Sequence, residues 1–332
     1  MSVWVRASGR AGLCLGLVLW ASAAGAADAT ATADPTAFLQ QVQSAARTLD
    51  YAGVTVYQQG RMLQSTHLVH RVDGTGERER QEVLDGSPQE CLRQNGMEQC
   101  LLPEHQLVVS RPAHSDHFPA LMLGSGATIA QQYDWKPQEG SYRVAGRECA
   151  VSELQARDAL RYSYRLCTDV QNHLLLKAQT LDAQGNLVDQ VAFSRVQLGA
   201  DIPDDALASH WDTHDWKVHT DTSQPADLAA QGWRFALPPG FQPIAELTRQ
   251  LAEGHTVDQL VLSDGLAAIS IFIETIDPKR DQSIRQGGLR QGAISIYRMR
   301  LASYWLTAVG EVPAQTVHDL AHAVQYIPQA AH

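Results

Sequence analysis

The sequence has no surplus of positive charge. Its 332 residues hold 26 Lys and Arg against 36 Asp and Glu, which gives a formal net charge of −10. Proteins that bind DNA or RNA neutralise phosphate groups with Lys and Arg, so the sequence predicts no nucleic-acid partner. A hydrophobic fraction of 44% and a charged fraction of 19% are typical of a soluble globular protein of about two domains.

The sequence also lacks the motifs that accompany the common enzyme chemistries. It has no nucleophile elbow, no His-Glu-x-x-His pair, no phosphate-binding loop and no dinucleotide fingerprint. His318 and His322 have the i, i+4 spacing that can bind zinc on a helix, but they fall on the polar face of the predicted helix. We therefore predict that the protein is not an enzyme, with no catalytic residues, no cofactor and no metal.

Only one long apolar run is present, and it lies at the N-terminus. Arg6 and Arg10 precede the apolar stretch 11–24, which is too short to span a bilayer, and small residues follow at Ala24 and Ala26. This arrangement predicts a cleaved signal peptide over residues 1–26 and a soluble protein in the periplasm. A buried N-terminal helix and an uncleaved anchor are the alternatives.

Few cysteines remain beyond this segment: Cys91, Cys100, Cys149 and Cys167. An oxidising compartment favours disulfides, and four cysteines allow three pairings. Asn95-Gly96 predicts a tight hairpin, and pairing outward from that turn sets Cys91 opposite Cys100. Cys149 and Cys167 are symmetric about Asp158 between two predicted strands, so they should also lie opposite one another. The sequence predicts bridges 91–100 and 149–167, with free buried thiols as the alternative.

Residues 28–200 are predicted to form a large β domain that opens with a helix. Asp34-Pro35 is a helix start, and apolar residues recur at helical spacing as far as Leu49. Strand-like runs and turn signals then alternate, among them one long run at Ser141–Leu154. No βαβ alternation occurs, so we expect an antiparallel sheet, and a sheet of about ten strands curls toward a barrel.

The C-terminal part is predicted to be a smaller α+β domain at 232–328, joined to the first by a linker at 201–231. Strands flank the hairpin signal Asp264-Gly265, and a terminal helix begins at Pro313. The charged stretch Asp277–Arg290 predicts an exposed loop.

An apolar segment at 118–133 interrupts the strands of the first domain. Its large apolar residues are Leu121, Met122, Leu123 and Ile129. They predict either a short helix that packs on the sheet or a mobile lid over the mouth of a half-open barrel. We take them as candidate residues of a lipid cavity, because a curved sheet can enclose a ligand and each buried CH₂ group contributes roughly 0.8 kcal/mol.

Several runs of the sequence resemble the RseB/MucB family, periplasmic negative regulators of extracytoplasmic-function (sigma-E-type) sigma factors. They occur in order from about residue 49 to residue 313. The matching runs are Leu49–Tyr57, Val69–Arg80, Leu84–Gly86, Arg143–Arg147, Tyr162–Leu166, Leu237–Phe241, Ser263–Ala267, Phe272–Glu274 and Val309–Pro313.

The resemblance implies a first domain similar to the lipoprotein carriers LolA and LolB, which is a half-open antiparallel β-barrel with a helical lid. It also implies a C-terminal domain that helps to bind the periplasmic part of a membrane anti-sigma factor of the RseA/MucA type. Such a protein shields its partner from site-1 proteolysis and is released in the envelope stress response by mislocalised lipopolysaccharide or lipoprotein. A LolA-type lipid or lipoprotein carrier is the alternative function. The sequence leaves open a homo-oligomer.

Overall fold

A computed structural model describes residues 34–113, 118–123, 126, 128–199, 201–250, 256–277 and 285–328. Residues 34–332 group into one compact unit, within which two large sheets hold most of the strands. The predicted signal peptide lies outside the described residues. No helix of the described part is both long enough and apolar enough to cross a membrane.

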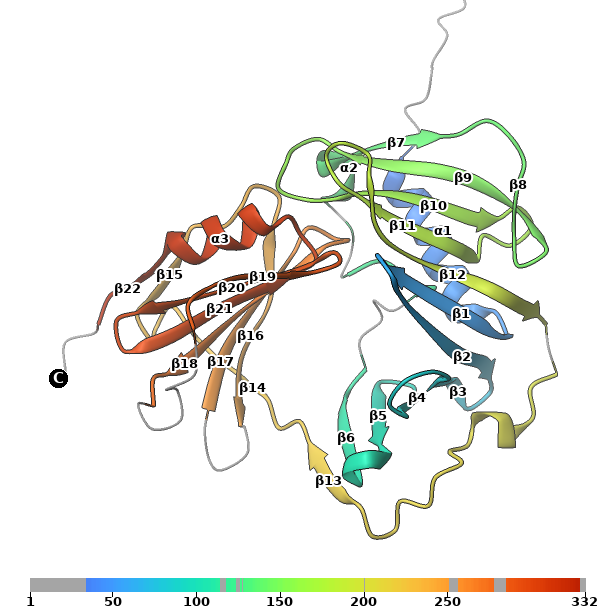
Figure 1. The fold of residues 1–332 in the computed structure, drawn as a ribbon, viewed down its shortest axis with the longest axis horizontal. Helices are drawn as coiled ribbons and strands as arrows, with labels where there is room; N and C mark the ends of the chain where they lie inside the picture. Colours follow the sequence, from blue (N-terminus) through green and yellow to red (C-terminus); the bar gives the residue numbers. More distant parts are fainter. Residues whose placement is uncertain are drawn as a thin grey trace, which may run out of the picture. The chain divides into compact units, whose positions relative to one another are not determined.

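The first sheet has 13 strands and is antiparallel apart from one edge pair, β13 with β6 (Figure 1). The strand order is β13-β6-β5-β4-β3-β2-β1-β12-β11-β10-β9-β7, with β8 also paired to β9. Among the described residues the two ends of this order, β13 and β7, do not pair, so the sheet is open and not a closed barrel. This agrees with the half-open barrel that the family resemblance implies. The strands are β1 (Tyr51–Gln59), β2 (Met62–Asp73), β3 (Gly76–Val83), β4 (Glu90–Gln94), β5 (Met97–Leu102), β6 (Leu107–Pro112), β7 (Tyr133–Pro137), β8 (Tyr142–Val144), β9 (Arg147–Ala156), β10 (Ser163–Asp169), β11 (Leu175–Leu181), β12 (Leu187–Leu198) and β13 (Lys217–Thr220).

Helix α1 (Pro35–Thr48) packs against one face of this sheet. The Asp34 carboxylate accepts a hydrogen bond from the Thr36 amide at 2.9 Å, and Pro35 fills a first-turn position where no amide donor is needed. The apolar stripe of the helix is buried against β9, β10 and β11, toward the β7 end of the sheet. This cluster includes Phe38, Leu39, Val42, Leu154, Leu166 and Leu175.

Two disulfides join the predicted pairs, but only one of the two predicted registers is correct. Cys91 and Cys100 lie directly opposite one another across the β4–β5 hairpin. Cys149 is bonded to Cys167 with a Cα–Cα distance of 5.4 Å, yet its partner in the ladder is Asp169. The bridge is therefore diagonal, because the loop between β9 and β10 is not symmetric about Asp158.

Three other segments differ from the sequence prediction. The run Ser141–Leu154 is two strands, because Ala145 and Gly146 take positive φ angles of 50° and 79° and form a tight turn. The segment 201–231 contains β13, a 3₁₀ turn at Asp204–Leu207 and β14 (Gln224–Pro225). Part of the expected loop at Asp277–Arg290 is an exposed edge strand, β19 (Gly287–Gln291).

The second sheet has seven strands in the order β14-β16-β17-β18-β21-β20-β19. Helix α3 (Ala314–Ala323) covers one face of it, and β15 (Trp233–Phe235) pairs with β22 (Val324–Tyr326) beside it (Figure 1). Ile269, Ile271 and Ile273 alternate along β18 and are buried in its core, as the sequence pattern predicted. The remaining strands are β16 (Gln242–Gln250), β17 (Thr256–Ser263), β18 (Ala268–Thr275), β20 (Ile294–Leu301) and β21 (Tyr304–Gly310).

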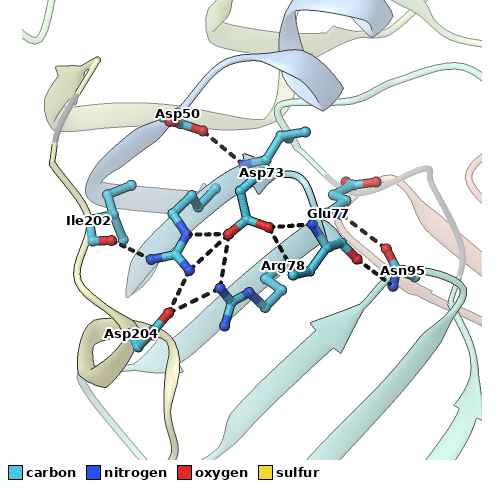
Figure 2. Close-up of polar contacts among 10 residues, drawn as sticks. Asp50, Asp73, Glu77, Arg78, Asn95, Ile202 and Asp204 are labelled. Atoms are coloured by element: carbon cyan, nitrogen blue, oxygen red, sulfur yellow. Dashed lines mark hydrogen bonds and ion pairs between the residues drawn. The ribbon is translucent and has the colours of Figure 1, made fainter.

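A network of ion pairs ties the start of the 201–231 segment to the β2–β3 hairpin (Figure 2). Arg71 donates to the Ile202 carbonyl and to the Asp204 carboxylate, both at 2.5 Å. Arg78 reaches the same Asp204 oxygen at 3.0 Å, and both arginines also bind Asp73. The network fixes the path of the segment as it leaves β12, although exposed ion pairs of this kind contribute little stability.

Glu77, at the start of β3, lies in a less exposed part of the same region. Its amide donates to the Asn95 side chain at 3.0 Å (Figure 2), and its carboxylate contacts Arg93 at 2.7 Å and His70 at 3.2 Å. Burial alone would raise the pKa of Glu77, but the His70 hydrogen bond and the Arg93 charge outweigh it and lower that pKa below its ordinary value.

Candidate functional site

The candidate site is a cavity of about 470 Å³ against the face of the first sheet on which α1 packs. This volume is in the range of small-molecule sites. Strands β1, β2, β10, β11 and β12 supply most of its wall. The remainder comes from Phe118 and Leu121, which precede α2, and from residues in or next to β19, β20 and β21 of the second sheet. The lining residues are Tyr57, Gln59, Met62, Gln64, Phe118, Leu121, Tyr164, Ala178, Thr180, Asp189, Gln190, Val191, Gln291, Ala293, Ile294 and Glu311.

Strand alternation places these side chains. Ala178 and Thr180 are two residues apart on β11 and both line the cavity, whereas Lys177 lines a separate surface hollow. Successive side chains of a strand point to opposite faces, so residues of β11 with odd and even numbers face different surroundings. The cavity wall is a mixture of apolar and aromatic groups with amides and carboxylates.

Asp189 joins the two parts of the cavity wall. Its Oδ2 atom accepts hydrogen bonds from the Tyr57 hydroxyl and from the Ala293 amide, both at 3.0 Å, and only 8% of the residue is exposed. Burial, followed by the adjacent Asp189 charge, raises the pKa of Tyr57 above its ordinary value. Tyr57 is therefore a neutral hydrogen-bond donor, and Asp189 holds the residue that precedes β20 against the first sheet.

Of the four candidate cavity residues, one lines the cavity and three do not. Leu121 lines the cavity, while Met122 and Ile129 are buried in the α1 cluster. Leu123 is half-buried, and its amide donates to the Gly265 carbonyl at 2.9 Å. The helical part of this segment is the single turn α2 (Ile129–Gln132), which packs on the sheet.

A second polar centre lies beside this segment, where the turn between β17 and β18 meets the first sheet. Asp264 in that turn and Arg161, which precedes β10, form an ion pair at 2.6 Å, and both side chains are fully buried. The Tyr133 hydroxyl donates to the same Asp264 oxygen at 2.9 Å. The other oxygen of Asp264 accepts from the amides of Leu266 and Ala267 at 2.9 and 2.8 Å.

The Arg161 guanidinium donates four hydrogen bonds. Besides Asp264 it binds both carboxylate oxygens of Asp158, at 3.0 and 3.1 Å, and the Pro239 carbonyl at 2.6 Å. Its guanidinium lies 4.8 Å from the centre of the Phe241 ring. Burial opposes the charge of Arg161, but the Asp158 and Asp264 carboxylates more than compensate and hold its pKa above the ordinary value.

Arg161, Asp189 and Asp264 were not predicted from the sequence as functional residues. The Asp264-Gly265 pair gave a turn signal, but nothing in a single sequence indicates which charged residue elsewhere in the chain faces that turn. The residues of the second sheet in the cavity wall, including Ala293 and Ile294, were missed for the same reason.

The described residues offer little that could hold a metal ion. The one group with three potential ligand atoms close together is Cys91, Glu98 and Cys100, with these atoms within 4.8 Å of one another. Both sulfur atoms are joined in a disulfide, so neither is a thiolate ligand.

Comparison with known proteins covers both sheets. The model of the MucB/RseB N-terminal domain matches residues 34–211, and the model of the MucB/RseB C-terminal domain matches residues 227–325. The sigma factor AlgU regulatory protein MucB of Pseudomonas aeruginosa is 29% identical over 320 residues, which cover 92% of this chain and 95% of that protein. The sigma-E factor regulatory protein RseB of Haemophilus influenzae is 26% identical over 253 residues, covering 74% of this chain and 76% of that protein.

A solved structure has the same architecture. The crystal structure of MucB in complex with MucA(peri) superposes with a TM-score of 0.68 at 27% identity, over 90% of this chain and 100% of that chain. The similarity therefore extends through both sheets.

Proposed function

Because this chain belongs to the MucB/RseB family, we propose that it is a negative regulator of an extracytoplasmic-function sigma factor and binds the periplasmic part of a membrane anti-sigma factor. The observation that carries this proposal is the match over both domains. A lipid or lipoprotein carrier, the alternative function, requires only the first sheet with its cavity. A relative with both domains was crystallised with MucA(peri), so the second domain favours a protein partner.

The place of action follows from the same partner. An anti-sigma segment outside the cytoplasmic membrane is accessible only to an exported protein, which agrees with the signal peptide expected at 1–26. Two disulfides in the first sheet are consistent with an oxidising compartment. The bound protein would shield the anti-sigma factor from site-1 proteolysis by covering the segment that the protease must reach. The regulatory names of the relatives favour a binding protein over an enzyme.

Isothermal titration calorimetry tests the partner. The mature chain, residues 27–332, is titrated with the periplasmic segment of the anti-sigma factor from the same organism, and a segment of scrambled sequence is the control. We expect saturable binding with a Kd of about 1 μM or tighter, as for a specific protein complex. Absence of binding at a protein concentration of about 50 μM would refute the proposal.

We also propose that the cavity binds one acyl chain and that this ligand regulates the partner. Phe118, Leu121 and Val191 supply apolar wall, and the carboxylates of Asp189 and Glu311 lie at the polar part. No Lys or Arg is among the described residues that line the cavity. An acyl ligand with an uncharged polar end therefore fits this wall better than one with a phosphate beside the chain, because like charges repel at short distance.

A pair of tryptophan substitutions on β11 tests the cavity. Thr180→Trp fills it, whereas Lys177→Trp adds the same side chain to the other face of the strand. Exclusion of about two methylene groups of a ligand costs roughly 1.6 kcal/mol, which is about a tenfold loss of affinity. We expect this loss for Thr180→Trp with a fluorescent monoacylglycerol and no loss for Lys177→Trp. Equal affinities of the two variants would contradict the assignment of the cavity.

A further inference from the structure

The β17–β18 turn, Asp264–Ala267, is bonded directly to the segment that supplies Phe118 and Leu121 to the cavity wall, of which the structure describes residues 118–123, 126 and 128–132. We call this segment the covering segment. The Gly265 carbonyl accepts from the Leu123 amide at 2.9 Å, and the Asp264 carbonyl accepts from the Thr128 hydroxyl at 2.7 Å. Leu266, at the tip of the turn, is 8% exposed and belongs to the apolar cluster of α1 and the first sheet. The turn of the second sheet is therefore built into the core of the first.

The covering segment contacts the cavity on its other side. Phe118 and Leu121 line the cavity, five and two residues before the Leu123 amide that binds the turn. The amides of Leu121 and Met122 both donate to the Gln43 side chain of α1 at 3.2 Å. A ligand that displaces Phe118 or Leu121 must therefore disturb either the bonds to α1 or the bonds to the turn.

The turn itself has little freedom to absorb such a displacement. Gly265 has a φ angle of +104°, and a Cβ atom at this position would lie 2.7 Å from the Ile129 side chain and 3.2 Å from the Gly126 Cα. The Asp264 carboxylate holds the turn from within through the Leu266 and Ala267 amides, and from outside through Arg161 and Tyr133. A shift of the covering segment would therefore move the whole turn.

From the turn, the displacement reaches the interior of the second sheet. Strands β17 and β18 form an antiparallel hairpin that extends from the turn, and they are neighbours in the middle of the seven-strand order. Ile269 and Ile271 of β18 are fully buried beneath α3, so the strand moves together with its core. Packed cores of this kind pass on small shifts because they are not continuously deformable.

We infer that the β17–β18 turn couples the cavity to the partner-binding function, and that Asp264 is the positioning residue that makes this coupling rigid. A ligand in the cavity lowers the affinity of the protein for the anti-sigma segment. The displacement passes from Leu121 to the Leu123 amide and from there to the Gly265 carbonyl. This inference rests on the proposed function and adds the route by which the ligand regulates the partner.

The test compares the full mature chain with two matched variants, Asp264→Asn and Asp169→Asn. Asp169 is 2% exposed, binds Arg147 at 2.6 Å through one oxygen and accepts the Gln171 amide through the other. Asp169→Asn therefore also weakens the ion pair of a buried carboxylate, although the Arg147 side chain is 27% exposed, and the hydrogen bonds it affects go to Arg147 and Gln171 and not to the covering segment. For each protein, the Kd of the anti-sigma segment is measured with and without a saturating fluorescent monoacylglycerol.

In the wild type and in Asp169→Asn, we expect the probe to weaken partner binding by about fivefold or more, a typical allosteric effect. Asp264→Asn still binds each ligand alone. The ratio of its Kd for the anti-sigma segment with the probe to the Kd without the probe falls toward one. By linkage, the partner changes the affinity of the probe by the same factor in each protein. Thr128→Val removes only the hydroxyl hydrogen bond to the turn, so we expect an intermediate ratio. This variant tests the inference if Asp264→Asn does not fold.

Other outcomes overturn the inference in distinguishable ways. If Asp264→Asn and Thr128→Val keep the full wild-type ratio, the turn does not carry the coupling. If the wild type binds both ligands independently, no coupling exists and the proposed regulation by the ligand fails, although the proposed binding of the anti-sigma segment stands. If the wild type binds no anti-sigma segment, the proposed function itself fails.

Discussion

Removal of the two disulfides should destabilise the first sheet by unequal amounts. The bridges close loops with sequence separations of 9 for Cys91–Cys100 and 18 for Cys149–Cys167. The loss of chain entropy in the unfolded state gives about 2.6 kcal/mol for the first bridge and about 3.2 kcal/mol for the second at 25 °C. Cys149 is only 1% exposed, so its replacement also leaves a small cavity and increases the difference.

The assay is urea unfolding of the oxidised wild type, Cys91→Ala/Cys100→Ala and Cys149→Ala/Cys167→Ala, followed by tryptophan fluorescence. Peptide mapping without reduction verifies the pairing in the wild type. We expect both double variants to be less stable, the second more so, and the reduced wild type to be less stable than either. A bridge between Cys91 and Cys149, or a change below about 0.5 kcal/mol for both variants, would refute the strand registers behind this reasoning.

Three further predictions concern single residues. Leu266→Ala should lower the free energy of unfolding by about 2–5 kcal/mol because it empties a core position, whereas Leu289→Ala, at a 65% exposed position, should stay within about 0.5 kcal/mol in the same urea assay. Glu77 has a folded-state pKa below its ordinary value, so its stabilisation is present at neutral pH and is lost as the pH falls through the folded pKa; the stability gap between wild type and Glu77→Gln should therefore shrink on acidification, and a constant gap in pH-dependent unfolding would contradict the pairing. Gly265→Ala should cost about 1–3 kcal/mol because its positive φ and its close packing both oppose a Cβ atom, while Gly74→Ala, with open space around it, should have little effect in thermal unfolding.

Local patterns in the sequence were sufficient for much of the fold. The helix start at Asp34-Pro35, the Asn95-Gly96 hairpin with its disulfide and the alternation of β18 depend on neighbours in the chain, and all three have the predicted form. The register of Cys149 and Cys167 depends on where the loop between β9 and β10 ends. A symmetric loop was the simplest assumption, and it was wrong by two residues.

Pairings between distant segments could not be obtained in this way. The parallel pair β6–β13 joins segments about a hundred residues apart, and neither carries a signal for the other. Arg161 and Asp189 likewise each bind one residue of the second sheet, Asp264 and Ala293. Such contacts arise from the packing of whole sheets, so a single sequence shows the charged residues without showing which of them meet.

The most direct test of the central claim is protection of the anti-sigma factor from its site-1 protease. The periplasmic segment is incubated with the protease, with and without a saturating amount of the mature chain, and the cleavage rate is followed by electrophoresis. We predict that the protein slows cleavage at least about tenfold and that the fluorescent monoacylglycerol restores it. An unchanged cleavage rate in the presence of folded, disulfide-bonded protein would contradict the account.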